Sequence, residues 1–130
     1  ITGGAGFLGY YLVQSILRWN TMGLTEPINL TVYDNYIRGA PDWLTALEGD
    51  ANLTLTKHDI THPLPEEIPD FHYVIHAASI ASPVFYRKDP IVTMDANVNG
   101  LRLLLDYVKQ HKHAGVLVEG FLFYSTSGTA

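Results

Sequence analysis

The spacing of apolar residues changes along the chain, and each spacing predicts a different element. Helical spacing predicts a first helix from Phe7 to about Met22, whose apolar face consists of Leu8, Leu12, Ile16 and Trp19. Alternation predicts strands over 28–33, ending at Asp34, and over 53–58, while apolar runs predict strands over 73–77 and 121–124. A second long helix is predicted from near Pro90, with apolar positions at Met94, Val98, Leu101, Leu105 and Val108.

The segments between these elements contain turn-forming residues. Residues 35–49 include Gly39 and Pro41 and predict a loop with at most a short helix. Residues 1–9 are typical of a strand end, a glycine turn and a helix start, so we expect the chain to begin within a strand. Residues 125–130 leave the last strand without entering another element, so we expect the chain to stop within the fold.

Strands that alternate with helices predict an α/β fold. The expected architecture is a Rossmann-type doubly wound parallel sheet with right-handed crossovers, truncated at both ends. In such a sheet, ligands bind in the crevice where the strand order reverses. The length of 130 residues predicts one domain.

Composition excludes several classes of function. The formal net charge is −5 and the basic residues are scattered, which argues against a nucleic-acid partner. The chain is 47% hydrophobic but has no apolar run of about 18 residues, so we expect neither disorder nor a membrane span. Cysteine is absent, and the pair His58 and His62 is followed directly by Pro63, so we expect no metal site.

A glycine cluster near the N-terminus indicates a dinucleotide site. Gly3, Gly6 and Gly9 form a G-x-x-G-x-x-G pattern between the predicted strand and helix. Glycine permits the tight turn, lets backbone amides approach a pyrophosphate and allows close packing of helix on sheet. Asp34 follows the second strand, where a carboxylate can accept hydrogen bonds from both ribose hydroxyls of NAD and repel the 2′-phosphate of NADP. We therefore expect NAD, although Arg38 is near enough in sequence to weaken this preference.

The same residues carry a family resemblance. The segment from Thr2 to Gly9, followed by Asp34 and Asn35, resembles the extended short-chain dehydrogenase/reductase family of nucleotide-sugar epimerases, dehydratases and decarboxylases. The resemblance continues through the segments His58-Asp59-Ile60, His76-Ala77-Ala78-Ser79 and Asn97-Val98-Asn99-Gly100. It implies that residues 1–130 are a partial NAD-binding domain, with the substrate domain outside this chain. The implied cofactor-binding residues are Gly3, Gly6, Phe7, Leu8, Gly9, Asp34, Asn35, Asp59, Ile60, Ala77, Ala78, Ser79, Asn97 and Ser125.

Within that family, one segment is most similar to UDP-glucuronate decarboxylases. Ala81-Ser82-Pro83-Val84-Phe85-Tyr86 matches the Ala-Ser-Pro-x-x-Tyr loop of those enzymes. The resemblance implies that Ser82, Pro83, Tyr86 and Arg87 border the pocket for a UDP-linked nucleotide sugar. The alternative is that Pro83 and Tyr86 only shape a loop before the helix.

The resemblance places a catalytic hydroxyl at Thr126, with Ser127 as the fallback. A hydroxyl can donate and accept a hydrogen bond at once, which suits it to align the sugar 4-OH while a tyrosine takes the proton. Two departures stand out: Ser127-Gly128 occupies the place of the usual acidic residue, and Ala130 that of a usual tyrosine. The Tyr-x-x-x-Lys pair of the family would lie beyond Ala130.

The implied activity is decarboxylation of a nucleotide sugar through a 4-keto intermediate, with NAD regenerated in each turnover. A 4-epimerase, a 4,6-dehydratase and a non-catalytic NAD-binding relative stay open as alternatives. The resemblance further implies a cytoplasmic enzyme that is a homodimer as the full-length protein.

Overall fold

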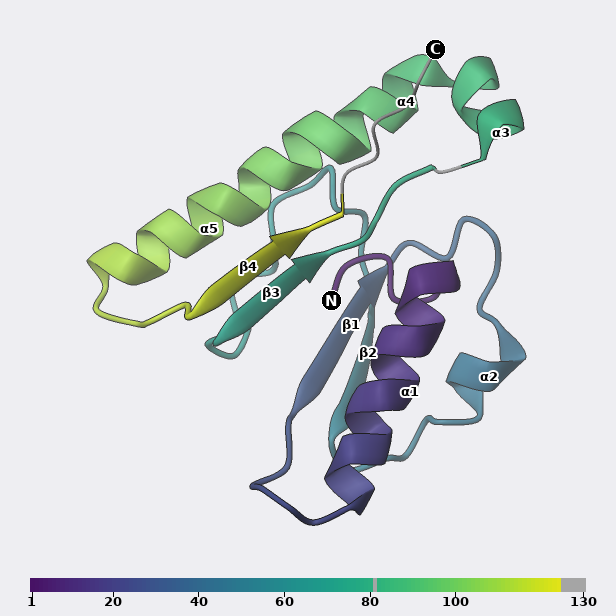
Figure 1. Cartoon of the computed structure of the whole chain (residues 1–130). Helices are drawn as coiled ribbons and strands as arrows, with labels where there is room; N and C mark the ends of the chain where they lie inside the picture. Colours follow the sequence, from purple (N-terminus) through teal and green to yellow (C-terminus); the bar gives the residue numbers. More distant parts are fainter. Residues whose placement is uncertain (81, 125–130) are drawn as a thin grey trace.

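The computed structural model describes residues 1–80 and 82–124. Its helices are α1 (Phe7–Thr21), α2 (Asp42–Thr45), α3 (Pro83–Lys88), α4 (Pro90–Met94) and α5 (Leu101–His113), and a π-helical segment, η1 (Asp95–Gly100), joins the last two. Its strands are β1 (Leu30–Asp34), β2 (Leu53–Lys57), β3 (Tyr73–His76) and β4 (Gly120–Phe123). Figure 1 shows α1 and α2 beside β1 and β2, and α5 running along β3 and β4.

The strands are parallel, and the N-terminal residues lie at the centre of the sheet. β1 pairs with β2, and β3 pairs with β4. Thr2 forms parallel bridges to Tyr33 of β1 and to His76 of β3. The order across the sheet is therefore β2, β1, Thr2, β3, β4, and the predicted parallel α/β sheet is confirmed. The strand order reverses at Thr2, which is where a ligand crevice is expected.

Apolar side chains are buried on both faces of the sheet. One buried cluster consists of Val13, Leu17, Leu30, Val32 and Leu44 and joins α1 and α2 to β1. The other consists of Ile60, Val74, Leu104 and Tyr107 and joins α5 to β3. Successive residues of a strand point to opposite faces, so Tyr33 points away from the first cluster and its ring packs against Phe71 beside the second.

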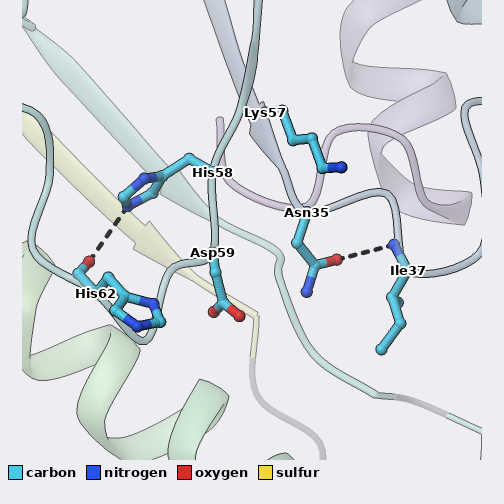
Figure 2. Close-up of a pocket in the computed structure, with 6 residues that line it drawn as sticks. All are labelled: Asn35, Ile37, Lys57, His58, Asp59 and His62. Carbon is cyan, nitrogen blue, oxygen red and sulfur yellow. Dashed lines mark hydrogen bonds between the residues drawn. The ribbon is translucent and has the colours of Figure 1, made fainter.

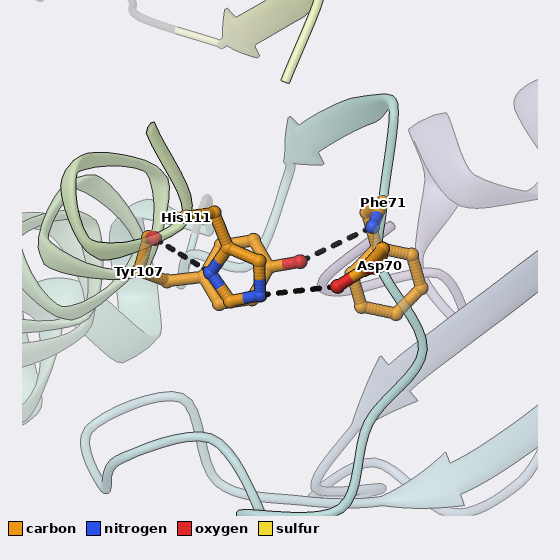
Figure 3. A network of polar contacts seen from close by, with 4 residues as sticks. All are labelled: Asp70, Phe71, Tyr107 and His111. Carbon is orange, nitrogen blue, oxygen red and sulfur yellow. Dashed lines mark hydrogen bonds and ion pairs between the residues drawn. The ribbon is translucent and has the colours of Figure 1, made fainter. Parts of the chain in front are cut away.

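Polar contacts attach α5 to the segment before β3 (Figure 3). The Phe71 N–H donates to the hydroxyl of Tyr107 at 3.2 Å. His111 Nδ1 lies 2.9 Å from the Tyr107 carbonyl oxygen, so this nitrogen is the donor, and Nε2 lies 3.5 Å from an Asp70 carboxylate oxygen. Only the doubly protonated imidazole can donate on both sides, so the ion pair with Asp70 forms only in that state.

Two elements differ from the prediction. The long helix from Pro90 is present, but Asp95–Gly100 is π-helical, and Gly100 there approaches Ile60 so closely that a Cβ would lie 3.1 Å from its Cγ2. Residues 83–88 form α3, although the sequence predicted only a loop there. This helix has Pro83 in its first turn and buries none of its residues, so it has no apolar face that periodicity could reveal.

Within residues 1–80 and 82–124, none of the helices combines the length and the hydropathy needed to cross a membrane.

Candidate functional site

The glycine turn connects Thr2 at the sheet centre to α1, and two of its glycines are required by the protein's own packing. Gly3 has a φ of +71°, and a Cβ there would lie 2.5 Å from the Cα of Ala78. A Cβ on Gly9 would lie 2.1 Å from the carbonyl oxygen of Gly4. These two glycines therefore let the turn press against the end of β3 and let α1 pack on the turn.

Gly6 differs from Gly3 and Gly9 because an added Cβ would meet only one backbone atom, in a tight contact that a shift of a few tenths of an ångström relieves. It is exposed, its φ is −84°, and the nearest atom to an added Cβ is the Gly3 carbonyl oxygen at 3.3 Å. The free side of Gly6 faces outward at the start of α1, which has no side-chain cap. The first N–H groups of α1, on Phe7 and Leu8, are thus available to a phosphate, and the helix dipole favours negative charge there.

Asp34 joins the glycine turn to the loop that follows β1. Its Oδ2 accepts a hydrogen bond from the Ala5 N–H at 3.0 Å, and its Oδ1 accepts one from the Tyr36 N–H at 2.8 Å. Each oxygen keeps a further lone pair, so the half-buried carboxylate can still accept hydrogen bonds from two ribose hydroxyls. Tyr36 adopts a left-handed φ of 54°, which turns the chain sharply after Asn35.

A cavity of about 560 Å³ opens at the carboxyl ends of β1 and β2 (Figure 2). It is lined by Asn35, Ile37, Lys57, His58, Asp59 and His62. The parallel register pairs Asp34 with Lys57, so the residues that follow each strand meet at this edge. Asn35 and Asp59 are both predicted cofactor residues, and the structure brings them together in this one cavity.

The polar groups of this cavity are held in place by short-range contacts. The Thr61 N–H and hydroxyl both donate to Asp59 Oδ1, at 3.0 and 2.8 Å, and the backbone bond is the main reason that the pKa of Asp59 is lowered. His58 Nε2 lies 3.2 Å from the His62 carbonyl oxygen. Because its pKa is lowered, the Asp59 carboxylate stays deprotonated, and thus a hydrogen-bond acceptor, to a lower pH than an ordinary aspartate.

Four of the lining residues were not predicted to be cofactor-binding residues from the sequence: Ile37, Lys57, His58 and His62. Their signal in the sequence was proximity to the predicted positions 35 and 59, and His58 also belongs to the His58-Asp59-Ile60 segment of the family resemblance. Ile60 differs from its predicted neighbour Asp59, because its side chain is buried against η1. A role of Ile60 in cofactor binding would thus belong to its backbone.

The segment after β3 lies against the glycine turn. The Ala77 N–H donates to the Thr2 carbonyl oxygen at 3.0 Å, and the backbone of Ala78 contacts Gly3. Small side chains at 77 and 78 allow this approach, and exposed Ser79 follows them. The structure thus places the predicted residues 77–79 beside the predicted glycine turn.

His76 lies beneath these segments and contacts several of them. Its side chain is 1% exposed, its Nδ1 lies 2.7 Å from Thr2 Oγ1, and its ring stacks on Phe123 of β4. Burial lowers the pKa of His76, and the carbonyl of Ala96 in η1 opposes this in part. Asn97, a predicted cofactor residue, is half-buried one position further along η1.

The predicted substrate residues gather on one short helix. Pro83, Tyr86 and Arg87 are exposed on α3, and Ser82 is its N-cap residue, whose carbonyl accepts the N–H groups of Phe85 and Tyr86 at 3.0 Å each. The predicted hydroxyls of Ser125 and Thr126, with the fallback Ser127, lie outside the described residues. Among the residues that are described, no group of three or more His, Cys, Asp or Glu side chains could hold a metal ion.

Comparison with known proteins gives a consistent result. The model of the NAD dependent epimerase/dehydratase family matches residues 1–130. UDP-glucuronic acid decarboxylase 6 of Arabidopsis thaliana is 36% identical over 110 residues, which cover 85% of this chain and 29% of that protein. UDP-glucuronic acid decarboxylase 1 of Danio rerio is 33% identical over 110 residues, with 85% and 24% covered. The chain thus spans less than a third of the length of these relatives.

Solved structures show the same fold. The dTDP-glucose 4,6-dehydratase of Streptomyces venezuelae, solved with NAD and TYD bound, superposes with a TM-score of 0.72 at 24% identity, covering 88% of this chain and 35% of that one. The UDP-glucose 4-epimerase of Thermus thermophilus, in complex with NAD, gives a TM-score of 0.59 at 24% identity, with 88% and 33% covered.

Proposed function

Because the chain belongs to the NAD-dependent epimerase/dehydratase family, we propose that the protein containing it decarboxylates UDP-glucuronate or a closely related UDP-linked uronic acid. The observation that supports this most is the 36% identity to a UDP-glucuronic acid decarboxylase over 110 residues, together with the Ser82-Pro83-x-x-Tyr86 segment. The cofactor of this family is NAD, which when bound would accept a hydride from a sugar carbon and later return it.

The described residues fit the adenosine and pyrophosphate parts of NAD. The exposed Gly6 and the free N–H groups of Phe7 and Leu8 suit the pyrophosphate. Asp34 suits the adenosine ribose and disfavours an added 2′-phosphate. The cavity containing Asn35 and Asp59 suits the adenine.

In this proposal the remaining residues bind and orient the nucleotide sugar. Ser82 at the N-cap of α3 and Tyr86 and Arg87 on the helix would contact its sugar and charged groups, and Arg87 would supply positive charge for a carboxylate. The Thr126 hydroxyl would align the sugar 4-OH for loss of its proton, and the Tyr-x-x-x-Lys pair that the family resemblance implies would supply the base.

A homodimer is part of the same proposal. The helix formed by α4, η1 and α5 carries Ile91, Met94, Val98 and Leu105 at helical spacing, and all four side chains are exposed. An apolar stripe of this kind is typical of a subunit interface. Light scattering on the complete protein, with a Val98→Glu variant for comparison, tests this point.

A cytoplasmic location also stays a prediction, which cell fractionation tests.

The experiment for the activity incubates the complete protein with NAD and ¹⁴C-carboxyl UDP-glucuronate and measures released CO2. We expect release by the wild type, roughly a hundredfold slower release by Thr126→Val and substantial activity in Thr126→Ser, because the hydroxyl survives only in the latter. Conversion of the sugar without loss of CO2 would favour the epimerase or dehydratase alternative, which the folds of the solved relatives and the Ser127-Gly128 departure keep open. NAD binding without any turnover would indicate a non-catalytic relative.

A further inference from the structure

A side-chain contact connects the loop after β1 to α3, the helix that carries the proposed substrate residues. The guanidinium carbon of Arg38, on the loop after β1, lies 5.1 Å from the ring centroid of Phe85 on α3. This is the distance of a cation–π interaction. The loop lines the adenosine cavity through Asn35 and Ile37, and α3 carries the residues proposed to contact the sugar. The contact thus joins two segments that lie far apart in the sequence.

The cofactor side of this contact is held by the residue that would bind the ribose. The Asp34 carboxylate accepts N–H groups from both Ala5 and Tyr36, and Asn35 Oδ1 accepts the Ile37 N–H at 3.1 Å. The Gly39 N–H donates to the Tyr36 carbonyl at 2.8 Å, which closes the loop around Arg38. A ligand that contacts Asp34 and Ile37 therefore acts directly on the backbone that carries Arg38.

The substrate side is held weakly. None of the six residues of α3 is buried, and its N-terminus has no side-chain cap. Local unfolding and reorientation cost least where few apolar side chains are buried. A contact as modest as one exposed cation–π pair, which shifts an equilibrium by roughly two- to fivefold, can therefore change the position of α3 measurably.

We propose that Arg38 is a positioning residue that couples the two sites: occupancy of the adenosine cavity holds Arg38 against Phe85, and this holds α3 in the orientation that binds the nucleotide sugar. The coupling rests on the function proposed above. Because binding free energies are reciprocal, the sugar nucleotide must strengthen cofactor binding by the same factor. This role differs from that of a phosphate ligand, since the guanidinium is directed at an aromatic ring of α3.

The coupling can be measured as a ratio of dissociation constants. Calorimetry on the complete protein gives the Kd of UDP-glucuronate with and without saturating NADH, which occupies the same site but cannot accept a hydride. We expect UDP-glucuronate to bind more tightly with NADH present in the wild type. In Arg38→Met, which keeps an apolar stem but loses the cation, this ratio should fall by roughly two- to fivefold, while the Kd of NADH alone changes by less than about twofold.

Two further variants test whether the coupling depends on the contact between Arg38 and Phe85. Phe85→Leu should reduce the ratio as Arg38→Met does, and the double variant should reduce it no further, as expected for partners in one contact. Lys88→Met removes a cation from the same helix and should leave the ratio unchanged. Thermal unfolding of all variants should match the wild type, because both side chains are on the surface.

The proposal is overturned if Arg38→Met keeps the wild-type ratio. It is equally overturned if Arg38→Met weakens NADH alone by more than about fivefold without changing the ratio, because Arg38 would then be a cofactor ligand. Failure of the wild type to bind NADH or UDP-glucuronate at all would instead refute the proposed function itself.

Discussion

A methyl group on Gly6 should separate cofactor binding from folding. An added Cβ would meet only the Gly3 carbonyl oxygen at 3.3 Å, and a φ of −84° suits alanine. Glycine is a better N-cap residue than alanine, so Gly6→Ala should lower the free energy of unfolding by about 0.5–1 kcal/mol. The same methyl group would stand where the proposed placement of NAD brings the pyrophosphate to the N–H groups of α1. Loss of a hydrogen bond to a charged group costs about 1.5–3 kcal/mol, so NAD should bind about 10- to 100-fold more weakly.

Two other glycines provide the comparison. In Gly9→Ala the Cβ would lie 2.1 Å from the backbone oxygen of Gly4, so α1 must move and the free energy of unfolding should fall by about 1–3 kcal/mol or more. Gly23 has a φ of +62° and nothing within 4 Å of its added Cβ. Gly23→Ala should therefore destabilise by about 1 kcal/mol through backbone strain alone and leave NAD binding intact.

Urea unfolding and NAD titration of these three variants in the complete protein are the measurements. The expected pattern is a large loss of NAD affinity with a small loss of stability for Gly6→Ala, a similarly small loss of stability with unchanged affinity for Gly23→Ala, and the largest loss of stability for Gly9→Ala. If Gly6→Ala binds NAD as the wild type does, the pyrophosphate does not lie against this turn, and the placement of the cofactor described above is wrong.

Three more variants test other parts of the structure. Asp34→Ala should weaken NAD binding about 10- to 100-fold, by about 1.5–3 kcal/mol, and reduce the difference in affinity between NAD and NADP. Titrations in which the ratio of the two dissociation constants stays at its wild-type value would contradict this. Burial holds the pKa of His76 below its ordinary 6.5, so the unfolded chain binds the proton more readily than the folded chain. The free energy of unfolding should therefore reach its highest value above about pH 6.5 and decline as the pH falls below it. Urea unfolding from pH 7 to 5 should show a shallower decline in His76→Gln, and equal slopes would exclude His76 as the cause. Tyr107→Phe leaves the Phe71 N–H without its acceptor and should cost about 1 kcal/mol of stability with NAD affinity unchanged, which urea unfolding and NAD titration check together.

The sequence by itself determined the elements that follow from local periodicity and the part of the site that follows from chain order. The helical spacing from Phe7 and the alternation before Asp34 specify α1 and β1 as elements, because side-chain direction repeats every 3.6 or every 2 residues. The buried face of α1 was predicted wrongly: it consists of Gly9, Val13 and Leu17, whereas the predicted Leu8 and Trp19 are exposed. The glycine turn was equally evident, since a tight turn between strand and helix needs glycine wherever it occurs.

Only the tertiary structure decided which distant residues meet. The parallel register of β1 with β2 pairs Asp34 with Lys57, and this brings the loops that carry Ile37 and His62 to one cavity. Nothing in local spacing encodes that register, which depends on how both faces of the sheet are buried. For the same reason α3 was missed, since it buries no residue, and its contact through Arg38 and Phe85 exists only because the fold places the loop after β1 beside it.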